Sequence, residues 1–427
     1  MDDLIVKVND NKIGPVSTKE LRTLVDQGVF GQQDLVWHEV SNRWIPAEDI
    51  SDLNSLFASA GSNGERAGRL YAIASGKGGV GKTVIAASLG VGLAMLGRKV
   101  ILVDADLGGA NLHTCMGVLQ PHLTYFDFLV GRKKHLSEVL LETPIENLSF
   151  MSGACGALGM SNPKYNQKQR FINHLKKLSA DHIIMDLGAG TAFNEIDFFL
   201  LADEQILVAS TEPAAIHEAF GFIKVCLFRT LTRALKYHPN ALEIIEKEKT
   251  NRPGQIHLTV SDLLDQVARA DPQACVIFES VLRMFRPRLI LNKVADSEEI
   301  SEGMAIQVAA KELLAVDVTY LGYISFDQQV RDSVIRMKPF LIFDPKCQAS
   351  QDLAALLRVK LLGKKGLKEI FERRQWRKQI IRKAKFYPEA NRSENAPVCS
   401  EKCFYWGDCE FQREAQPCPV RHLEAER

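Results

Sequence analysis

The sequence of 427 residues lacks several features that would assign it to an obvious class. It has no run of about 18 uninterrupted apolar residues, which argues against a membrane-spanning helix. Its 53 lysine and arginine residues nearly balance its 52 aspartate and glutamate residues, so the net charge of +1 indicates no particular partner. The start of the chain, MDDLIVKVND, is acidic and its apolar run is too short for a signal peptide.

The sequence also lacks the cysteine pattern of a secreted protein. Five of its nine cysteines are scattered, and without a secretory signal they indicate reduced thiols in a cytoplasmic protein. No G-x-S-x-G element is present, which argues against a serine hydrolase of that type. The five scattered cysteines are Cys115, Cys155, Cys226, Cys275 and Cys347.

The stretch GKGGVGKT, from Gly76 to Thr83, follows an apolar run and precedes a helix-compatible one. Its spacing is that of a phosphate-binding loop between a strand and a helix, G-x-x-x-x-G-K-[ST]. Glycines let backbone N–H groups close around phosphate oxygens, and the helix N-terminus adds partial positive charge. In such a loop Lys82 contacts the β- and γ-phosphates, and the Thr83 hydroxyl contacts Mg²⁺. The ATP-binding residues predicted here are Gly76, Lys77, Gly78, Gly79, Val80, Gly81, Lys82 and Thr83.

Three aspartates end apolar runs that are typical of buried strands. Asp104 and Asp106 are two residues apart, so their side chains share one face of a strand. Asp186 ends another run and is followed by Gly188 and Gly190. Because nucleotides bind at the carboxyl ends of parallel strands, we expect these carboxylates at the nucleotide crevice. Asp186 would hold Mg²⁺ through water, and the two glycines would let the backbone approach the γ-phosphate.

These motifs resemble those of the deviant Walker A ATPases, which include MinD, ParA, FlhG, Mrp and the nitrogenase iron protein. In that family a lysine at the position of Lys77 reaches across a dimer interface to the partner's nucleotide. The resemblance therefore implies an ATP-dependent homodimer. It implies that Asp106 orients the attacking water, that Asp104 supports the metal and the loop, and that Asn292 lies against the adenine ring. Glu212, at the start of a later helix, is expected to face the partner subunit.

The residues expected to act together follow from the motifs and the resemblance. The catalytic set is Lys77, Lys82 and Asp106. The Mg²⁺ set is Thr83, Asp104 and Asp186. The resemblance covers about residues 69–360, and the DLGAG form around Asp186 is closer to FlhG-like and other MinD-type proteins than to ParA partition proteins.

We expect an α/β protein with a doubly wound, mostly parallel sheet of the P-loop NTPase type, because apolar runs alternate with helix-compatible segments. A small α+β module would precede it, and a helix with a cysteine-rich tail would follow. The predicted parts are an interaction module at 1–57, a linker at 58–68, the ATPase at 69–362 with a helical insertion at about 230–285, a basic amphipathic helix at 363–390 and a metal-binding tail at 391–427.

The first module has a Gly14-Pro15 turn signal, a helix capped by Ser17 with Glu20 three residues on, and then Trp37 and Trp44. This pattern resembles the GYF_2-type domains of bacterial proteins. The resemblance implies an interaction module for a protein partner, with an aromatic groove that takes proline-rich peptides. The alternative is that both tryptophans belong to the core of the module.

Residues 364–385 contain ten lysines and arginines against two acids, and their apolar residues fall on one broad helical face. MinD and FlhG end in a short amphipathic helix that grips membrane, so the resemblance implies an anionic membrane surface as one partner. A peripheral location at the inner face of the membrane would follow. Packing on the ATPase is the simpler alternative, and nucleic acid is the less favoured one.

The tail carries four closely spaced cysteines, with His422 as a possible replacement for one of them. Such a cluster suggests tetrahedral Zn²⁺ or, alternatively, a [4Fe–4S] cluster. A metal would staple a segment too short to bury much core. The predicted tail ligands are Cys399, Cys403, Cys409 and Cys418.

The favoured function is an ATP-hydrolysing, Mg²⁺-dependent dimerisation switch of the MinD/FlhG type, slow without a partner. It would regulate the place or number of a cell-envelope or motility structure. An Mrp-like iron–sulfur carrier is the alternative, although the family's carrier C-x-x-C is absent from the ATPase core. A ParA-like DNA-partition ATPase is weaker.

Overall fold

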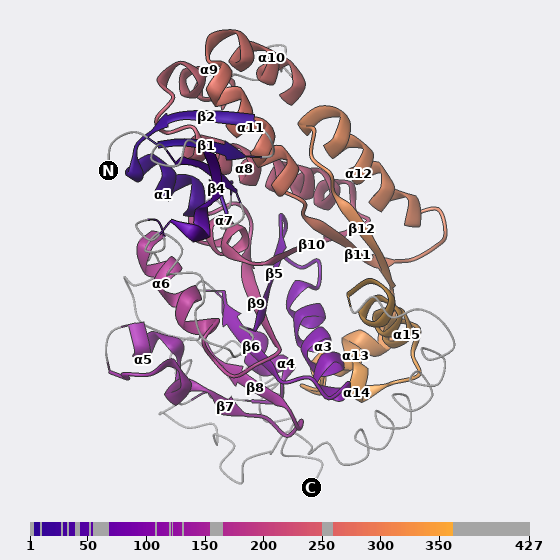
Figure 1. Cartoon of the computed structure of the whole chain (residues 1–427). Helices are drawn as coiled ribbons and strands as arrows, with labels where there is room; N and C mark the ends of the chain where they lie inside the picture. Colours follow the sequence, from indigo (N-terminus) through magenta and orange to yellow (C-terminus); the bar gives the residue numbers. More distant parts are fainter. Residues whose placement is uncertain are drawn as a thin grey trace, which may run out of the picture.

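The computed structural model contains a small N-terminal sheet beside a larger α/β body (Figure 1). The predicted basic helix at 363–390, the tail at 391–427 and Cys155 lie outside the residues that it describes. The structure describes residues 4–8, 11–26, 29–31, 34–38, 43–50, 53, 68–106, 109–118, 121, 123–129, 132–153, 165–249 and 259–361.

The larger body is built on an eight-stranded sheet in the order β12-β11-β10-β5-β9-β6-β8-β7. Its paired strands run parallel, except the short edge strand β7, which is antiparallel to β8. The predicted doubly wound, mostly parallel sheet is confirmed. The strands are β5 (Arg69–Ser75), β6 (Val100–Ala105), β7 (Leu141–Glu142), β8 (Leu148–Met151), β9 (His182–Ala189), β10 (Glu204–Ser210), β11 (Arg288–Val294) and β12 (Thr319–Ser325).

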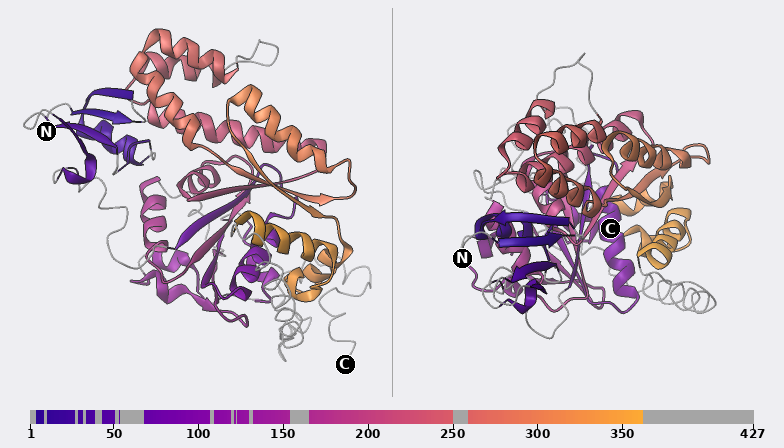
Figure 2. Two further views of the ribbon diagram at one scale, coloured as in Figure 1. Left: turned by 45° about the vertical axis from the view of Figure 1, so that its right-hand side comes forward. Right: turned by 45° about the horizontal axis from the view of Figure 1, so that its top comes forward.

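Helices cover both faces of this sheet, as Figures 1 and 2 show. Along β5, Leu70 and Ala72 pack into one apolar cluster, whereas Tyr71 and Ile73 pack into the other. This alternation is expected of a strand buried on both sides. The helices are α3 (Lys82–Met95), α4 (Leu112–Cys115), α5 (Tyr125–Leu129), α6 (Tyr165–Leu175), α7 (Phe193–Leu201), α8 (Pro213–Ala234), α9 (Pro239–Lys249), α10 (Val260–Ala270), α11 (Pro272–Met284), α12 (Ile300–Leu314), α13 (Gln328–Ile335), α14 (Phe340–Phe343) and α15 (Gln348–Ala355), with the short helical turns η4 (Leu136–Val139) and η5 (Leu356–Leu361).

The N-terminal module is an antiparallel sheet in the order β2-β1-β3-β4 with one helix packed on it. The Ser17 backbone N–H donates to Glu20 Oε2 and the Glu20 N–H donates to Ser17 Oγ, so the predicted capping box is confirmed. The elements are β1 (Leu4–Val8), β2 (Asn11–Val16), α1 (Thr18–Asp26), β3 (Leu35–His38), β4 (Arg43–Pro46) and η2 (Ala47–Asp49).

The turn predicted at Gly14-Pro15 is wrong, because both residues lie inside β2. Gly14 has φ of +138°, and a Cβ there would lie 2.7 Å from the carbonyl oxygen of Leu4. The glycine therefore permits close approach of β1 and β2 instead of reversing the chain.

The module docks on the helices between β10 and β11. Gln273 Nε2 on α11 donates to the Gly14 carbonyl oxygen at 2.9 Å. His238, just before α9, places Nε2 3.5 Å from Glu20 Oε1, while its Nδ1 lies 2.8 Å from Asp271 Oδ2. Figure 2 shows the module beside these helices and away from β11 and β12.

No disulfide joins the four scattered cysteines that fall within the described ranges, all of which are free thiols. Within the same ranges, no helix is both long enough and apolar enough to cross a membrane.

Candidate nucleotide-binding site

The loop between β5 and α3 has the backbone that its glycines permit. Gly79 and Gly81 have φ of +80° and +91°, values that other residues rarely adopt. A Cβ on Gly76 would collide with the backbone of Glu218 in α8. The loop then enters α3 at Lys82, so backbone N–H groups gather at a helix N-terminus, as a phosphate-binding loop requires.

Lys82 and Asp186 form a buried ion pair at the floor of this loop. Lys82 Nζ lies 2.6 Å from Asp186 Oδ1, and the two side chains are 7% and 1% exposed. The Thr83 hydroxyl also bonds to Asp186, whose pKa is raised by burial. The second oxygen, Oδ2, is buried and has no hydrogen-bond partner in the part of the chain that the structure describes.

Asp104 faces this pair from the neighbouring strand β6, where it is registered beside Asp186 of β9. Burial, and secondarily the charge of Asp186, raises the pKa of Asp104 to about 7. Its oxygens accept the N–H groups of Leu112 at 3.0 Å and Asp106 at 3.3 Å. Two crowded carboxylates with one unpaired oxygen form an arrangement that a divalent cation would relieve.

The donor set fits a cation held mainly by water and phosphate. In the described ranges, no three or more histidine, cysteine, aspartate or glutamate side chains converge on a metal-sized site. Mg²⁺ in nucleotide sites keeps several waters and uses one or two carboxylates plus substrate phosphates. The Thr83 hydroxyl and Asp186 Oδ2 are therefore suited to Mg²⁺ that arrives with a nucleotide.

Asp106 lies at the mouth of the site, after β6. Its Oδ1 accepts the Gly109 N–H at 2.9 Å. A Cβ on Gly188 would lie 3.4 Å from this oxygen and 2.8 Å from Glu195 Oε1. Asp106 thus lies beside Gly188, together with Glu195, which sequence reasoning missed.

Lys77 points to the open side of the loop, away from the buried Lys82. Its Nζ lies 2.6 Å from Glu212 Oε2, and the side chains are 37% and 58% exposed. Glu212 caps the start of α8, and its hydrogen bond with Lys77 lowers the pKa of its carboxyl group. The sequence singled out both residues but gave no indication that they pair within one chain.

The end of β11 holds the loop from the other side. Asn292 Nδ2 donates to the Val80 carbonyl oxygen at 2.7 Å, and Lys293 Nζ donates to that of Gly79 at 2.8 Å. Asn292 was expected beside the adenine ring; here it lies at the loop and fastens its backbone. Lys293 was not among the predicted site residues.

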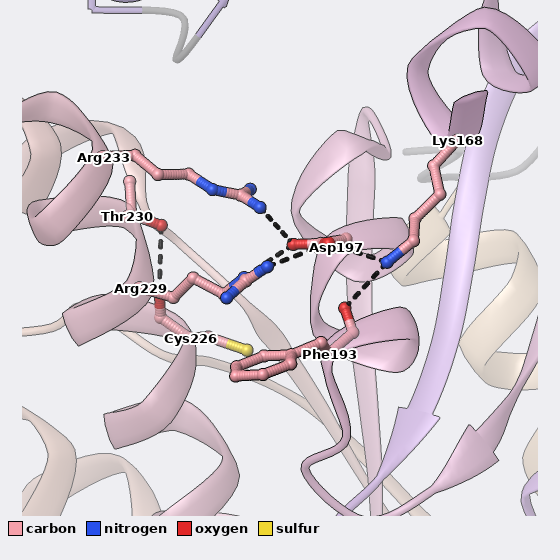
Figure 3. Close-up of polar contacts among 7 residues, drawn as sticks. All are labelled: Lys168, Phe193, Asp197, Cys226, Arg229, Thr230 and Arg233. Atoms are coloured by element: carbon pink, nitrogen blue, oxygen red, sulfur yellow. Dashed lines mark hydrogen bonds and ion pairs between the residues drawn. The ribbon is translucent and has the colours of Figure 1, made fainter. Parts of the chain in front are cut away.

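A cluster of cations fixes α7, the helix after the glycine segment (Figure 3). Asp197 accepts hydrogen bonds from Lys168 at 2.8 Å, Arg229 at 2.6 and 3.0 Å, and Arg233 at 2.5 Å. Burial raises the pKa of Asp197, but the Arg229 and Lys168 hydrogen bonds outweigh it and the net shift is downward. Lys168 also donates to the Phe193 carbonyl oxygen at 3.2 Å, so α6, α7 and α8 are tied together at one point.

Residues 71–340 match the family model described as the CobQ/CobB/MinD/ParA nucleotide binding domain, and residues 5–53 match GYF domain 2. The first match spans more than half of the chain. The protein therefore belongs to the CobQ/CobB/MinD/ParA nucleotide-binding family, and both resemblances stated from the sequence are confirmed.

Curated relatives include the antiactivator FleN of Pseudomonas aeruginosa, which is 36% identical over 159 residues, or 37% of this chain and 56% of FleN. The flagellum site-determining protein YlxH of Helicobacter pylori is 32% identical over 189 residues, or 42% of this chain and 58% of YlxH. The chain thus spans little more than half the length of these relatives. A solved structure of the septum site-determining protein MinD with Mg-ADP, from Pyrococcus horikoshii, has 25% identity and a TM-score of 0.47 over 69% of this chain and 97% of that one.

Proposed function

We propose that this protein is an ATP-hydrolysing switch that forms a homodimer when ATP is bound. The observation that carries the proposal is the separation of its two loop lysines. Lys82 is buried against Asp186, whereas Lys77 lies on the open side of the same loop. In this proposal Lys82 binds the nucleotide of its own subunit, and Lys77 contacts the nucleotide of the partner subunit.

Different groups of the chain bind the phosphates, hold the loop and orient the attacking water during ATP hydrolysis. Loop N–H groups and Lys82 bind the phosphates, with Lys82 moving from Asp186 Oδ1 to the phosphate oxygens. Asn292 and Lys293 keep the loop in shape. Asp106 accepts a hydrogen bond from the attacking water and orients it, while Gly188 allows the γ-phosphate to approach the backbone.

Mg²⁺, held by the Thr83 hydroxyl and through water by Asp186, would neutralise charge on the phosphates. Asp104 would support this arrangement from β6. The raised pKa values of Asp104 and Asp186 support the proposal, since a cation would stabilise the ionised carboxylates that burial disfavours.

The cellular role is proposed from the relatives. FleN is named an antiactivator and YlxH a flagellum site-determining protein. We infer that this chain likewise regulates the place or number of a motility or cell-envelope structure. Turnover would be slow without a partner, because a switch must persist in its ATP-bound form.

The N-terminal module is proposed to bind a protein partner. Trp37 and Trp44 form an edge-to-face pair with ring centroids 5.4 Å apart, and the Lys7 ammonium lies 5.9 Å from the centre of the Trp44 ring. Both tryptophans are half-buried, whereas Val36 beside Trp37 is fully buried in the core cluster. Such an aromatic pair suits a peptide rich in proline.

Membrane binding and a metal site in the tail are proposals that rest on sequence alone. Membrane binding by the basic segment, and Zn²⁺ or an iron–sulfur cluster on the four tail cysteines, concern residues beyond those described. The iron–sulfur carrier alternative depends on that same tail. We keep the switch as the single proposed function.

The proposal is tested by hydrolysis of ATP by the full chain with Mg²⁺. Lys82→Gln should lose roughly 10²-fold or more of the hydrolysis rate, because a positioned charge on the transferring phosphoryl group is removed. The control is Lys311→Gln, which removes an exposed lysine near the end of α12 that forms an ion pair with Asp317. Equal hydrolysis rates for Lys82→Gln and wild type would contradict the proposal. Wild-type protein that binds ATP but does not hydrolyse it would contradict the proposal too.

A further inference from the structure

Glu195 lies beside Gly188, close to Asp106. It lies in the first turn of α7, and its Oε1 lies 2.8 Å from the position that a Cβ on Gly188 would take. Asp106 Oδ1 lies 3.4 Å from that same position. Two carboxylates, one from the loop after β6 and one from α7, therefore border one small space beside the backbone that would approach the γ-phosphate.

One oxygen of Glu195 has no donor. Oε2 is buried and lacks a hydrogen-bond partner in the described part of the chain. The Glu195 carboxyl group is hydrogen-bonded to the residue's own backbone N–H, and the charges of Lys168 and Lys82 act on it. Leaving a buried acceptor unpaired costs about 1–3 kcal/mol, so native proteins usually satisfy such an atom with water or ligand.

The environment favours Glu195 over Asp106 as a base. Asp106 Oδ1 already accepts the Gly109 N–H at 2.9 Å, so this oxygen is engaged. Burial raises the pKa of Glu195, and the neighbouring charge of Asp106 raises it further. A carboxylate with a raised pKa accepts a proton more readily near neutral pH.

The helix that carries Glu195 is held in place. Asp197, two residues further along α7, is fixed by Lys168, Arg229 and Arg233, and Lys168 also bonds to the Phe193 carbonyl oxygen (Figure 3). These contacts tie the first turn of α7 to α6 and α8. Glu195 is thus presented from a rigid element, as a catalytic group should be.

We propose that Glu195 is a second carboxylate on the attacking water and accepts its proton, while Asp106 orients the same water. The inference rests on the proposed ATP hydrolysis. The water oxygen forms a bond to the γ-phosphorus, and the bond from that phosphorus to the bridging oxygen breaks, leaving its electron pair on ADP. The water's proton passes to the Glu195 carboxylate and then to solvent, and inorganic phosphate is released.

The test is single-turnover hydrolysis of radiolabelled ATP by Glu195→Gln in the full chain. The amide keeps the size and the hydrogen-bonding oxygen of the side chain but is no base. We expect the rate to fall about 10²-fold or more, with unchanged ATP affinity and a longer-lived ATP-bound form. Glu195→Asp, which is shorter but basic, should retain part of the lost rate.

The matched control is Glu299→Gln. Glu299 is also a half-buried glutamate at a helix start, and its Oε2 accepts the Ala295 N–H at 2.6 Å. A near-normal rate in Glu195→Gln would overturn the inference. A rate loss accompanied by weaker ATP binding, or by a lower melting temperature than the control shows, would assign Glu195 a structural role and overturn it too. Wild type that binds but does not hydrolyse ATP would refute the proposed function itself.

Discussion

At the scale of single residues, the site is shaped by the burial of two neighbouring carboxyl groups. Asp104 and Asp186 lie side by side on β6 and β9, and both have raised pKa values because of burial. Lys82 partly compensates Asp186 through the 2.6 Å contact, whereas the donors to Asp104 within the described ranges are backbone N–H groups. Ionisation of these two carboxyl groups therefore lowers the free energy of unfolding of the nucleotide-free protein.

Asp104 makes the stability of the nucleotide-free protein depend on pH. Its pKa rises from 3.8 to about 7 on folding, so the folded chain binds more protons than the unfolded chain between those values. The free energy of unfolding should therefore fall as pH rises through this window. Asp104→Asn cannot titrate and should flatten this slope, by on the order of 1–3 kcal/mol between pH 5 and about 8.

Chemical denaturation at several pH values, without nucleotide or Mg²⁺, measures this slope. Asp317→Asn is the control, since Asp317 is exposed and forms an ion pair with Lys311 on the surface. If Asp104→Asn and wild type kept the same slope, the shifted carboxyl group would have to be another one.

Residue identity was predictable where a motif fixes it. The loop glycines, Lys82, Thr83 and the three aspartates come from spacing and from their places at strand ends. Glu195 and Lys293 could not be found in this way, because each reaches the loop region from an element whose local sequence has no phosphate-binding pattern. The Lys77–Glu212 pair joins residues 135 positions apart, and only the tertiary fold brings them together.

At the scale of elements, α8 connects distant parts of the molecule. It starts at the Glu212 cap beside Lys77, carries Arg229 and Arg233 to Asp197, and is followed by His238 at the N-terminal module. Its 22 residues make it a rigid rod along the face of the sheet. A shift of α7 near the nucleotide would therefore meet resistance from α8.

Asp197 should be a strong determinant of stability. Asp197→Asn leaves Lys168, whose side chain is 2% exposed, and two half-buried arginines without their carboxylate. Removing one partner of a buried ion pair typically costs about 3–5 kcal/mol, so we expect a loss near the lower end because two of the cations reach solvent.

Denaturant unfolding of the single and double variants tests this expectation. Adding Lys168→Met to Asp197→Asn removes the most buried cation and should restore part of the loss. A loss below about 1 kcal/mol for Asp197→Asn would show that the cluster contributes no more than a surface ion pair.

Elements were predictable where local signals agree. The strand–loop–helix order and the Ser17–Glu20 capping box follow from sequence, because each depends on neighbours in the chain. The start of α10 follows the same rule, since Thr259 and Asp262, three residues apart, form its capping box. The Gly14-Pro15 prediction was wrong because the same dipeptide occurs in turns and in strands where a glycine lets a neighbouring strand approach closely.

At the scale of the whole molecule, the doubly wound sheet follows from alternating apolar runs and helical segments. The docking of the N-terminal module does not, since it depends on Gln273, His238 and Glu20 meeting across the fold. The module is thereby joined to helices that continue from α8. The contacts of the module and the contact of Lys77 with Glu212 therefore lie on the same run of helices, from α8 to α11.

The central claim is closure of two copies over ATP, and sedimentation of Asp106→Ala with ATP and Mg²⁺ tests it most directly. We expect a dimer with ATP and a monomer with ADP, because the variant binds ATP but hydrolyses it too slowly to reopen. Adding Lys77→Gln should leave ATP bound to a monomer, whereas Lys311→Gln should still dimerise. If Asp106→Ala stays monomeric at saturating ATP, the sandwich mechanism is wrong.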